Sequence, residues 1–579
     1  MKFKYIALTA AVALTSMTSC NDFLDKAPDT RVELQDVEQL RELMVDGYDQ
    51  YDYSTVCELS SDNVIDNNSP SDKGVRYNLA PYDVMDNELF AWKDVKSSTD
   101  TNSPSAQWNG CYAAIASCNA VLEAADRIEA QGGLSTDDAA KLRAVRGEAL
   151  VSRAYHHFVL TNIFCMPYRG DELSQKDLGI PYITKPETKL NVKYERGTVK
   201  QDYDSIERDL KAGLPLINDG IYEVSKYHFN KQAAYAFAAR FYLFKRDYPQ
   251  VVAYADSAFS GQDPAKLMSN IWSQTSFYYI KDISLYNTRI ARPNNFLLLA
   301  TYSQWPRRLS SSYRYTCNRD AKRGTIQGPG PSWKNNKFTN SSTKETFAMN
   351  SCFRNVLGSS GGAEYGAYFA GNAGEQFEYT DKVSGIGYTH NVRAEFTAEE
   401  TLLCRAEAKL FMGDIDGCVA DLKIWDDARQ DNTDKGTSSM VPLTAQLITN
   451  FYDRENDPGY GIIKDIHVDE VCPSEKYRVS AEIEPYLQCV LHYRRIQNVH
   501  NGMRWFDIKR MGLSITHNIG TQGNKTLESL DSRYAIQIPT EVLSTGFTPN
   551  PRYEAPKSPV KGKPNMVSLK FDLVPLVNK

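Results

Sequence analysis

Cys20 is the residue whose chemical role the sequence defines most clearly. A basic start and a short apolar run precede it, which is typical of an export signal that is removed on maturation. The run is too short to cross a bilayer as a helix. Thr18 and Ser19 stand directly before the cysteine as in a bacterial lipobox, with Met17 where leucine is usual. We expect residues 1–19 to be a lipoprotein signal peptide and Cys20 to be acylated, which would anchor the chain through its lipid. The alternative is an ordinary signal peptide followed by an incidental cysteine.

Aromatic residues outside the helical patterns form a second group of candidates. Rigid rings on irregular segments can pack against the flat faces of a ligand such as a sugar. Core packing or contact with a partner protein is the alternative role for each ring. Arg307, Arg308 and Arg314 nearby could serve an acidic ligand, although a solvated basic face is the simpler explanation. The candidate ligand-binding residues are Trp305, Tyr313, Tyr315, Trp333, Trp272 and Trp92.

Motifs for catalysis and metal binding are weak. Residues 358–362 match G-x-S-x-G with Ser360 at the nucleophile position, but the flanking segments do not predict the strand and helix of a nucleophile elbow. His156 and His157 are adjacent on a predicted helix and point about 100° apart, so both cannot easily bind one metal ion. The acidic and amide residues of segment 62–68 do not have EF-hand spacing. We predict no catalytic residue, metal or cofactor, although calcium stays possible without a motif.

Composition narrows the class of partner and the role of the cysteines. A net charge of −6 and a pI near 5.9 give no global basic field for nucleic acid, so we expect no nucleic-acid partner. Ten cysteines follow Cys20 in what we take to be an exported chain, which also allows disulfides. Several of them lie in helical apolar patterns, so we favour buried free thiols.

Three segments have the apolar spacing of helical hairpins. Residues recur at steps of three and four in about 108–164, 200–259 and 394–430, with turn residues such as Gly132 and Gly413 between the helices. Small residues at the helix crossings and one large apolar residue per turn are typical of tetratricopeptide hairpins. The segments are scattered rather than tandem. We therefore predict one packed helical scaffold that is interrupted by insertions.

The largest insertion spans about 261–391. It is rich in Gly, Ser, Asn and Tyr, and it contains one strand-like run at 296–302. A segment of this length is too long for a passive loop. The sequence predicts a mostly α single domain over 20–579, in which tetratricopeptide-like hairpins support an irregular insertion lobe that faces a ligand or a partner.

The C-terminal part carries a recognisable signature in about 493–543. The run GMRWFDIKRMG at 502–512 resembles the signature of the SusD-like (RagB/SusD) family of Bacteroidetes outer-membrane lipoproteins. The segments GIPYITKPET at 179–188 and DSRYAIQIPTEVL at 531–543 are also similar to that family. We interpret the signature as structural, with Trp505 and Phe506 buried and Asp507 paired with an arginine.

The resemblance implies a function as well as a fold. It implies four tetratricopeptide-like hairpins, attachment to the outer membrane through the lipid anchor and exposure at the cell surface. It also implies a nutrient-binding role without catalysis, in which glycans are delivered to a SusC-like TonB-dependent transporter. Peptide binding, or docking mainly to the transporter, is the alternative within the same family.

Overall fold

The computed structural model describes most of the chain between residues 34 and 553. Within this range it does not describe 71–75, 98, 188–191, 270–279, 310–312, 326–327, 334–336, 340–345, 349–357, 361–366, 370–373 and 430–440. Cys20 and Trp272 lie outside the described residues, so the expectations for them stay predictions.

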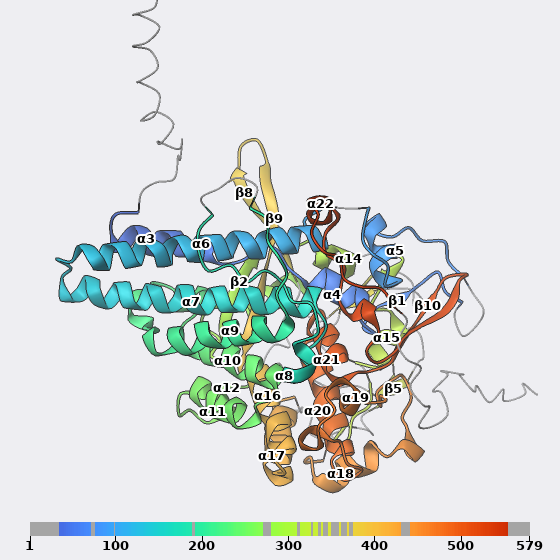
Figure 1. Cartoon of the computed structure of the whole chain (residues 1–579). Coiled ribbons are helices and arrows are strands. Elements are labelled where there is room, and N and C mark those ends of the chain that lie inside the picture. Colours follow the sequence, from blue (N-terminus) through green and yellow to red (C-terminus); the bar gives the residue numbers. More distant parts are fainter. Residues whose placement is uncertain are drawn as a thin grey trace, which may run out of the picture.

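Two long antiparallel helices form one layer of the molecule, as Figure 1 shows. They are α6 (Pro104–Gln131) and α7 (Thr136–Phe164), which confirm the first predicted hairpin. Ser103 accepts a hydrogen bond from Ala106 N and begins α6, and Ser135 likewise caps α7 through Asp138 N. Gly132 has φ of +70°, which glycine adopts without strain and which turns the chain between the helices.

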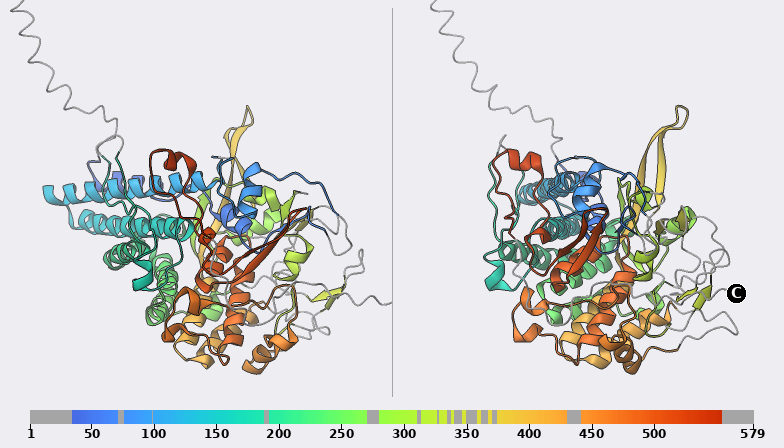
Figure 2. Two further views of the ribbon diagram at one scale, coloured as in Figure 1. Left: turned by 45° about the vertical axis from the view of Figure 1, so that its right-hand side comes forward. Right: turned by 90° about the vertical axis from the view of Figure 1, so that its right-hand side faces the viewer.

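The remaining scaffold helices stack below this layer (Figures 1 and 2). The pairs α10 (Lys231–Lys245) with α11 (Tyr248–Phe259), and α16 (Ala398–Phe411) with α17 (Ile415–Asp427), are the other predicted hairpins. Helix α9 (Val199–Gly213) packs on α7, and α20 (Glu484–Gln497) packs on α16. The mostly α fold that the sequence predicted is therefore confirmed.

Short elements connect and cover the scaffold. The helical ones are α3 (Val37–Leu43), η1 (Met44–Gly47), α4 (Ser54–Ser60), α5 (Val84–Phe90), α8 (Asp171–Ser174), η2 (Leu214–Leu216), η3 (Asp219–Ile221), η4 (Ser225–Tyr227), α12 (Pro264–Leu267), α13 (Ile280–Asn287), α14 (Trp305–Leu309), α15 (Arg319–Arg323), α18 (Ala445–Phe451), η7 (Arg454–Asn456), α19 (Val468–Val471), η8 (Glu475–Tyr477), α21 (Met503–Met511), η9 (Ser532–Tyr534) and α22 (Thr540–Ser544). None of the helices in the described ranges is both long and apolar enough to span a membrane.

The main sheet comes from the predicted insertion. It has the order β2–β9–β8, all antiparallel, and the strand-like run of the sequence is its strand β2 (Asn295–Thr301). Strands β8 (Glu375–Asp381) and β9 (Ile386–Thr397) form a hairpin that projects beyond the body of the molecule in every view (Figures 1 and 2). Four two-stranded sheets complete the described strands: β1 (Ile65–Asp66) with β3 (Tyr315–Thr316), β4 (Lys337–Thr339) with β5 (Thr346–Ala348), β6 (Gly358–Ser360) with β7 (Ala367–Phe369), and β10 (Ile515–Ile519) with β11 (Gly523–Leu527).

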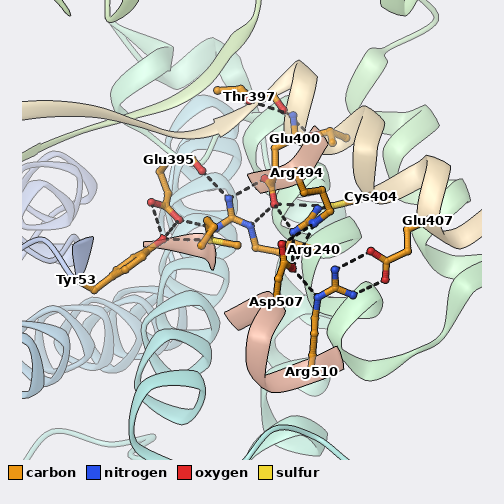
Figure 3. A network of polar contacts seen from close by, with 12 residues as sticks. Tyr53, Arg240, Glu395, Thr397, Glu400, Cys404, Glu407, Arg494, Asp507 and Arg510 are labelled. Atoms are coloured by element: carbon orange, nitrogen blue, oxygen red, sulfur yellow. Dashed lines mark hydrogen bonds and ion pairs between the residues drawn. The ribbon is translucent and has the colours of Figure 1, made fainter. Parts of the chain in front are cut away.

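The signature helix α21 lies in the core, as interpreted from the sequence. Asp507 accepts from Arg494 Nε at 3.1 Å and from Arg510 Nε at 2.7 Å, and Arg510 also pairs with Glu407 of α16 (Figure 3). Burial alone would raise the pKa of Asp507, but the two guanidinium groups lower it to about 2. Lys509 donates to Cys165 O at 2.7 Å, where α7 ends.

A second part of the network reaches strand β9. Arg240 of α10 donates to Glu400 Oε2 at 2.8 Å and pairs with Glu395 of β9 (Figure 3). The other carboxylate oxygen of Glu395 lies 2.7 Å from Arg393. Tyr53 donates to the same carboxylate at 3.0 Å. Helices and the sheet are thus joined by buried charges that are all paired.

The nine cysteines within the described ranges are buried free thiols, which agrees with the reading favoured from the sequence. Cys352 lies outside those ranges.

Substituting Asp507 tests the buried network. Asp507→Asn should lower the free energy of unfolding by about 3–5 kcal/mol, because it leaves buried arginine charges without their carboxylate. The pKa of Asp507 is about 2 in the folded protein and about 3.9 in an unfolded chain. Its contribution is therefore complete above pH ~4 and is lost as the pH falls toward ~2. Urea denaturation across this range should show the difference between wild type and variant shrinking.

The matched control is Asp427→Asn, which removes an exposed partner of Lys423. Its cost should be within about 0.5 kcal/mol. Equal effects of the two substitutions would contradict the role given to the network.

Candidate functional site

A pocket of about 420 Å³ opens where the β8–β9 hairpin leaves the body. Its walls are the segment that ends η1 and leads to α4, the end of η4, the outer part of β2 and the root of the hairpin. Tyrosine, histidine and carboxylate side chains dominate the lining. The lining residues are Val45, Asp46, Tyr48, Asp49, Gln50, Tyr227, His228, Leu298, Leu299, Ala300, Thr301, Tyr302, Glu378, Tyr388 and His390.

Tyr302 and Tyr388 form the aromatic wall of this pocket. Their ring centroids lie 5.2 Å apart with planes at 72°, and both side chains are partly exposed. Tyr302 is held by its backbone N–H, which donates to Gln50 O at 2.7 Å just after β2 ends. Tyr227 adds an exposed ring from η4. These rings offer flat apolar faces with polar edges toward the open space.

The hairpin places a carboxylate beside this wall. Glu378 and Tyr388 are direct partners across β8 and β9, so their side chains lie on the same face. Tyr388 Oη donates to Glu378 Oε2 at 2.9 Å, and this hydrogen bond raises the pKa of Tyr388. His390, two residues further along β9, has Nδ1 4.0 Å from the same oxygen. Alternation along the strand therefore turns Tyr388 and His390 toward the pocket.

His228 stands on the opposite wall in a fixed orientation. Its Nδ1 lies 2.8 Å from Oε1 of the buried Glu148, which also accepts from Tyr48 Oη at 2.6 Å. The imidazole stacks on Tyr222 with centroids 4.5 Å apart. Because Glu148 occupies Nδ1, Nε2 is the ring nitrogen left for a ligand.

The outer edge of β2 adds backbone groups. Tyr302 N–H points away from β9 toward Gln50, so alternation along an antiparallel strand turns the N–H and C=O groups of Ala300 and Leu298 outward as well. Ala300 is exposed, whereas Leu298 is fully buried, so the accessible backbone groups of this edge are those of Ala300. The pocket therefore offers both donors and acceptors beside its aromatic wall.

The charges around the pocket are negative. Asp46 is exposed at its rim, Glu378 lies on the hairpin and Asp49 forms the floor. Burial raises the pKa of Asp49 to about 7. No lysine or arginine is among the described residues that line the pocket. The site thus disfavours anionic groups.

The aromatic platform predicted from the sequence is not an open surface, which corrects that expectation. Trp305 and Trp333 are each only 1% exposed, and Trp92 and Tyr315 are also buried. The three indole N–H groups donate to backbone carbonyls: Trp305 to His500, Trp333 to Gly328 and Trp92 to Ser60. An indole whose N–H donates to a backbone carbonyl can be buried as a large core residue, and these three tryptophans are core residues.

Tyr313 is the described candidate that stays partly exposed. It meets Tyr82 edge to face with ring centroids 5.1 Å apart, and neither ring is among the residues that line the pocket. The nearby arginines are engaged by carboxylates: Arg307 by Glu375, Arg308 by Asp86 and Arg314 by Asp66.

Ser360 is not in a nucleophile elbow. It ends β6, which pairs with β7 in an antiparallel ladder, whereas an elbow needs a strand followed by a helix. Among the described residues, no group of three or more His, Cys, Asp or Glu side chains is arranged to hold a metal ion. Asp62, considered for calcium, instead pairs with Arg504 at 2.8 Å.

Sequence reasoning missed the pocket residues because their role depends on long-range pairing. Tyr388 and His390 alternate along β9, which is a usable local signal for one shared face. Tyr302 closes the strand-like run that the sequence revealed. Nothing local indicates that residues 45–50 and 227–228 complete the walls.

Solved structures share this fold over nearly the whole chain. A SusD superfamily protein from Bacteroides thetaiotaomicron is 17% identical, with a TM-score of 0.56, over 89% of this chain and 100% of that one. Another from Bacteroides vulgatus is 17% identical with a TM-score of 0.57, over 90% and 100%. A structure described as a laminarin-binding SusD-like protein is 14% identical with a TM-score of 0.50, over 89% and 99%. No curated protein sequence matches significantly.

The helical scaffold with its projecting sheet is therefore the fold that these solved SusD-like structures share. Residues 22–243 match a family model described as starch-binding and associating with the outer membrane. This match and the signature in α21 make the chain similar to SusD-like proteins.

Replacing a buried tryptophan tests its structural role. Trp333→Ala should lower the free energy of unfolding by about 3–5 kcal/mol, because the ring packs on Tyr493 in the core. Denaturation monitored by circular dichroism measures this loss. Tyr379→Ala, at an exposed hairpin ring, is the control and should change stability by less than about 1 kcal/mol. If Trp333→Ala is as stable as the wild-type protein, the ring does not contribute to the core as described.

Proposed function

We propose that this protein binds carbohydrate in the pocket between η4, β2 and the β8–β9 hairpin. The observation that carries the proposal is the aromatic wall of Tyr302 and Tyr388 beside the carboxylate of Glu378. A pyranose presents an apolar face of axial hydrogens that packs on such rings, while its hydroxyl groups hydrogen-bond to carboxylates, imidazoles and backbone groups at the edge. The match of residues 22–243 to a family model described as starch-binding supports the same ligand class.

The negative charge of the pocket narrows the class of glycan that it can bind. Asp46 and Glu378 repel carboxylate and sulfate groups, and no lining lysine or arginine compensates them. The protein should therefore prefer neutral glycans to uronic or sulfated ones. This replaces the acidic ligand that the arginines of the insertion suggested, since those arginines already pair with carboxylates.

Peptide capture is the second candidate function. The exposed edge of β2 at Ala300 supports it, because an extended peptide could pair there as a further strand. The aromatic wall favours the glycan, and a strand-edge peptide would not require it.

Alanine substitutions in the wall test the glycan proposal. Tyr302→Ala and Tyr388→Ala should each weaken affinity at least ten-fold, about 1.4 kcal/mol, because each removes a stacking face. Isothermal titration with maltoheptaose, laminarihexaose, oligogalacturonate and extended peptides measures this and ranks the ligand classes.

Tyr82→Ala is the matched control, since Tyr82 forms a partly exposed ring pair with Tyr313 and does not line the pocket. Its affinity should stay within about two-fold of wild type. Loss of binding in Tyr82→Ala with full binding in both pocket variants would move the site to that surface. Binding of peptides alone would favour the second candidate.

We also propose that the mature protein is a lipoprotein of the outer membrane that passes its ligand to a SusC-like TonB-dependent transporter. The lipobox at Cys20 supports the anchor, and the family description supports the membrane. We propose no catalytic activity for the protein. The tyrosine, histidine and carboxylate side chains that line the pocket are suited to holding a ligand by stacking and hydrogen bonds.

Replacing the lipidated cysteine tests the anchor. Cys20→Ala should leave the membrane fraction in a strain that lacks the transporter, because the acyl chains supply the attachment. Circular dichroism of the released protein should match wild type. Retention of the folded variant in the membrane fraction would exclude acylation of Cys20 as the anchor.

A further inference from the structure

The pocket beside the hairpin is bordered by carboxylates that can accept further hydrogen bonds. The side chain of Glu378 is 58% exposed, and its Oε2 accepts from Tyr388 Oη at 2.9 Å. Its second oxygen, Oε1, has no hydrogen-bond partner within the described residues. Asp46, from the opposite end of the lining sequence, is exposed at the rim. Two carboxylates from different elements therefore border the same open space.

His228 adds a third acceptor because of the group behind it. Its Nδ1 lies 2.8 Å from Oε1 of Glu148, whose side chain is only 2% exposed. The same oxygen accepts from Tyr48 Oη at 2.6 Å. A carboxylate can only accept, so Nδ1 of His228 carries the hydrogen. Nε2 of the neutral ring is then left as an acceptor for a ligand.

The protein does not supply positive charge to these acceptors. In the described part of the chain, no lysine or arginine lines the pocket or forms an ion pair with Asp46 or Glu378. Lys226, next to Tyr227 in η4, donates to Asn295 O at the far end of β2. Arg393 of β9 has a side chain that is 5% exposed and lies 2.7 Å from Glu395. These neighbouring cations are thus engaged away from the pocket.

A primary ammonium group complements this arrangement. It has three N–H donors and no acceptor, whereas a sugar hydroxyl donates only one hydrogen. Its hydrogen bonds to a carboxylate are charge-assisted and therefore stronger than those of a hydroxyl. An ammonium is also attracted to the faces of aromatic rings. The rings of Tyr302 and Tyr388 lie beside Glu378, so carboxylate and ring faces are available together.

From the acceptors of the lining, the two carboxylates without a cationic partner and the adjoining rings, we infer that the pocket recognises glycans that carry free primary amino groups. The inference rests on the proposed function and names its ligand class. The pyranose packs on Tyr302 or Tyr388, its ammonium group binds Glu378, and Asp46 adds attraction at the rim. A lysine-rich peptide offers the same ammonium group but no flat face for the rings, so the aromatic wall favours the glycan.

Two oligosaccharides that differ only in the amino group test the inference. Isothermal titration compares the β-1,4-linked tetramer of glucosamine with cellotetraose, in a mildly acidic buffer that keeps the amines protonated. The wild-type chain should bind the amino tetramer at least about ten-fold more tightly, because only this ligand brings positive charge to the carboxylates. The ratio of the two affinities should fall as salt is added, since the carboxylates are exposed to screening.

An isosteric substitution identifies the residue that selects the amine. Glu378→Gln removes the charge and keeps an oxygen for Tyr388 Oη. The preference for the amino tetramer should fall to within about two-fold, while the affinity for cellotetraose stays within about three-fold of wild type. Asp427→Asn is the control, because it removes an equal charge from an exposed site that does not line the pocket. It should keep the wild-type preference.

Equal affinity of the wild-type chain for the two tetrasaccharides would overturn the inference and leave the proposed function in place. An unchanged preference in Glu378→Gln, or an equal loss in Asp427→Asn, would overturn it as well. Tetralysine that binds as tightly as the amino tetramer and competes with it would assign the pocket to amine-bearing peptides instead. Absence of binding to every glycan used here and above would overturn the proposed function together with the inference.

Discussion

The buried carboxylate of Glu395 is the point at which the helical scaffold holds the strand that carries the pocket. It lies between Arg240 of α10 and Arg393 of β9, and Tyr53 donates to it from α4's leading segment. Burial alone would raise the pKa of Glu395, but the two arginines lower it. A charge at this depth is tolerable only with all partners in place, which fixes β9 against α10. Tyr388 and His390 lie further out on the same strand, so the ion pairs of Glu395 also fix the position of this wall of the pocket.

The same logic extends through the signature helix. Arg494, Asp507, Arg510 and Glu407 join α20, α21 and α16 in one buried set (Figure 3). Segments more than 100 residues apart in the sequence meet there, and each charge is satisfied by another element. The residues of the signature therefore act on the fold, while the residues that line the pocket lie partly on a hairpin at its margin. Because the buried network and the pocket consist of different residues, the pocket residues can differ between proteins that share this scaffold.

The helical hairpins were predictable because their signals are local. Apolar spacing, capping serines and turn glycines at 103–164 act within a few residues of one another. Asp507 was predictable in kind, as a buried acid that needs an arginine, although its actual partners were not. The prediction of Trp305 and Trp333 as ligand residues was wrong for a physical reason. Both lie in irregular sequence, but segments that are distant in the sequence cover their rings. Tyr388 and His390 become pocket residues only through pairing with Glu378 and through walls contributed by residues 45–50 and 227–228.

Whether the pocket beside the hairpin holds a glycan is decided by the position of a bound oligosaccharide in a crystal structure of the complex. We expect a sugar ring stacked on Tyr302 or Tyr388, with a hydroxyl group hydrogen-bonded to Glu378 and no acidic substituent in the pocket. Density for the sugar at Tyr82 and Tyr313, with the pocket free of ligand, would contradict it.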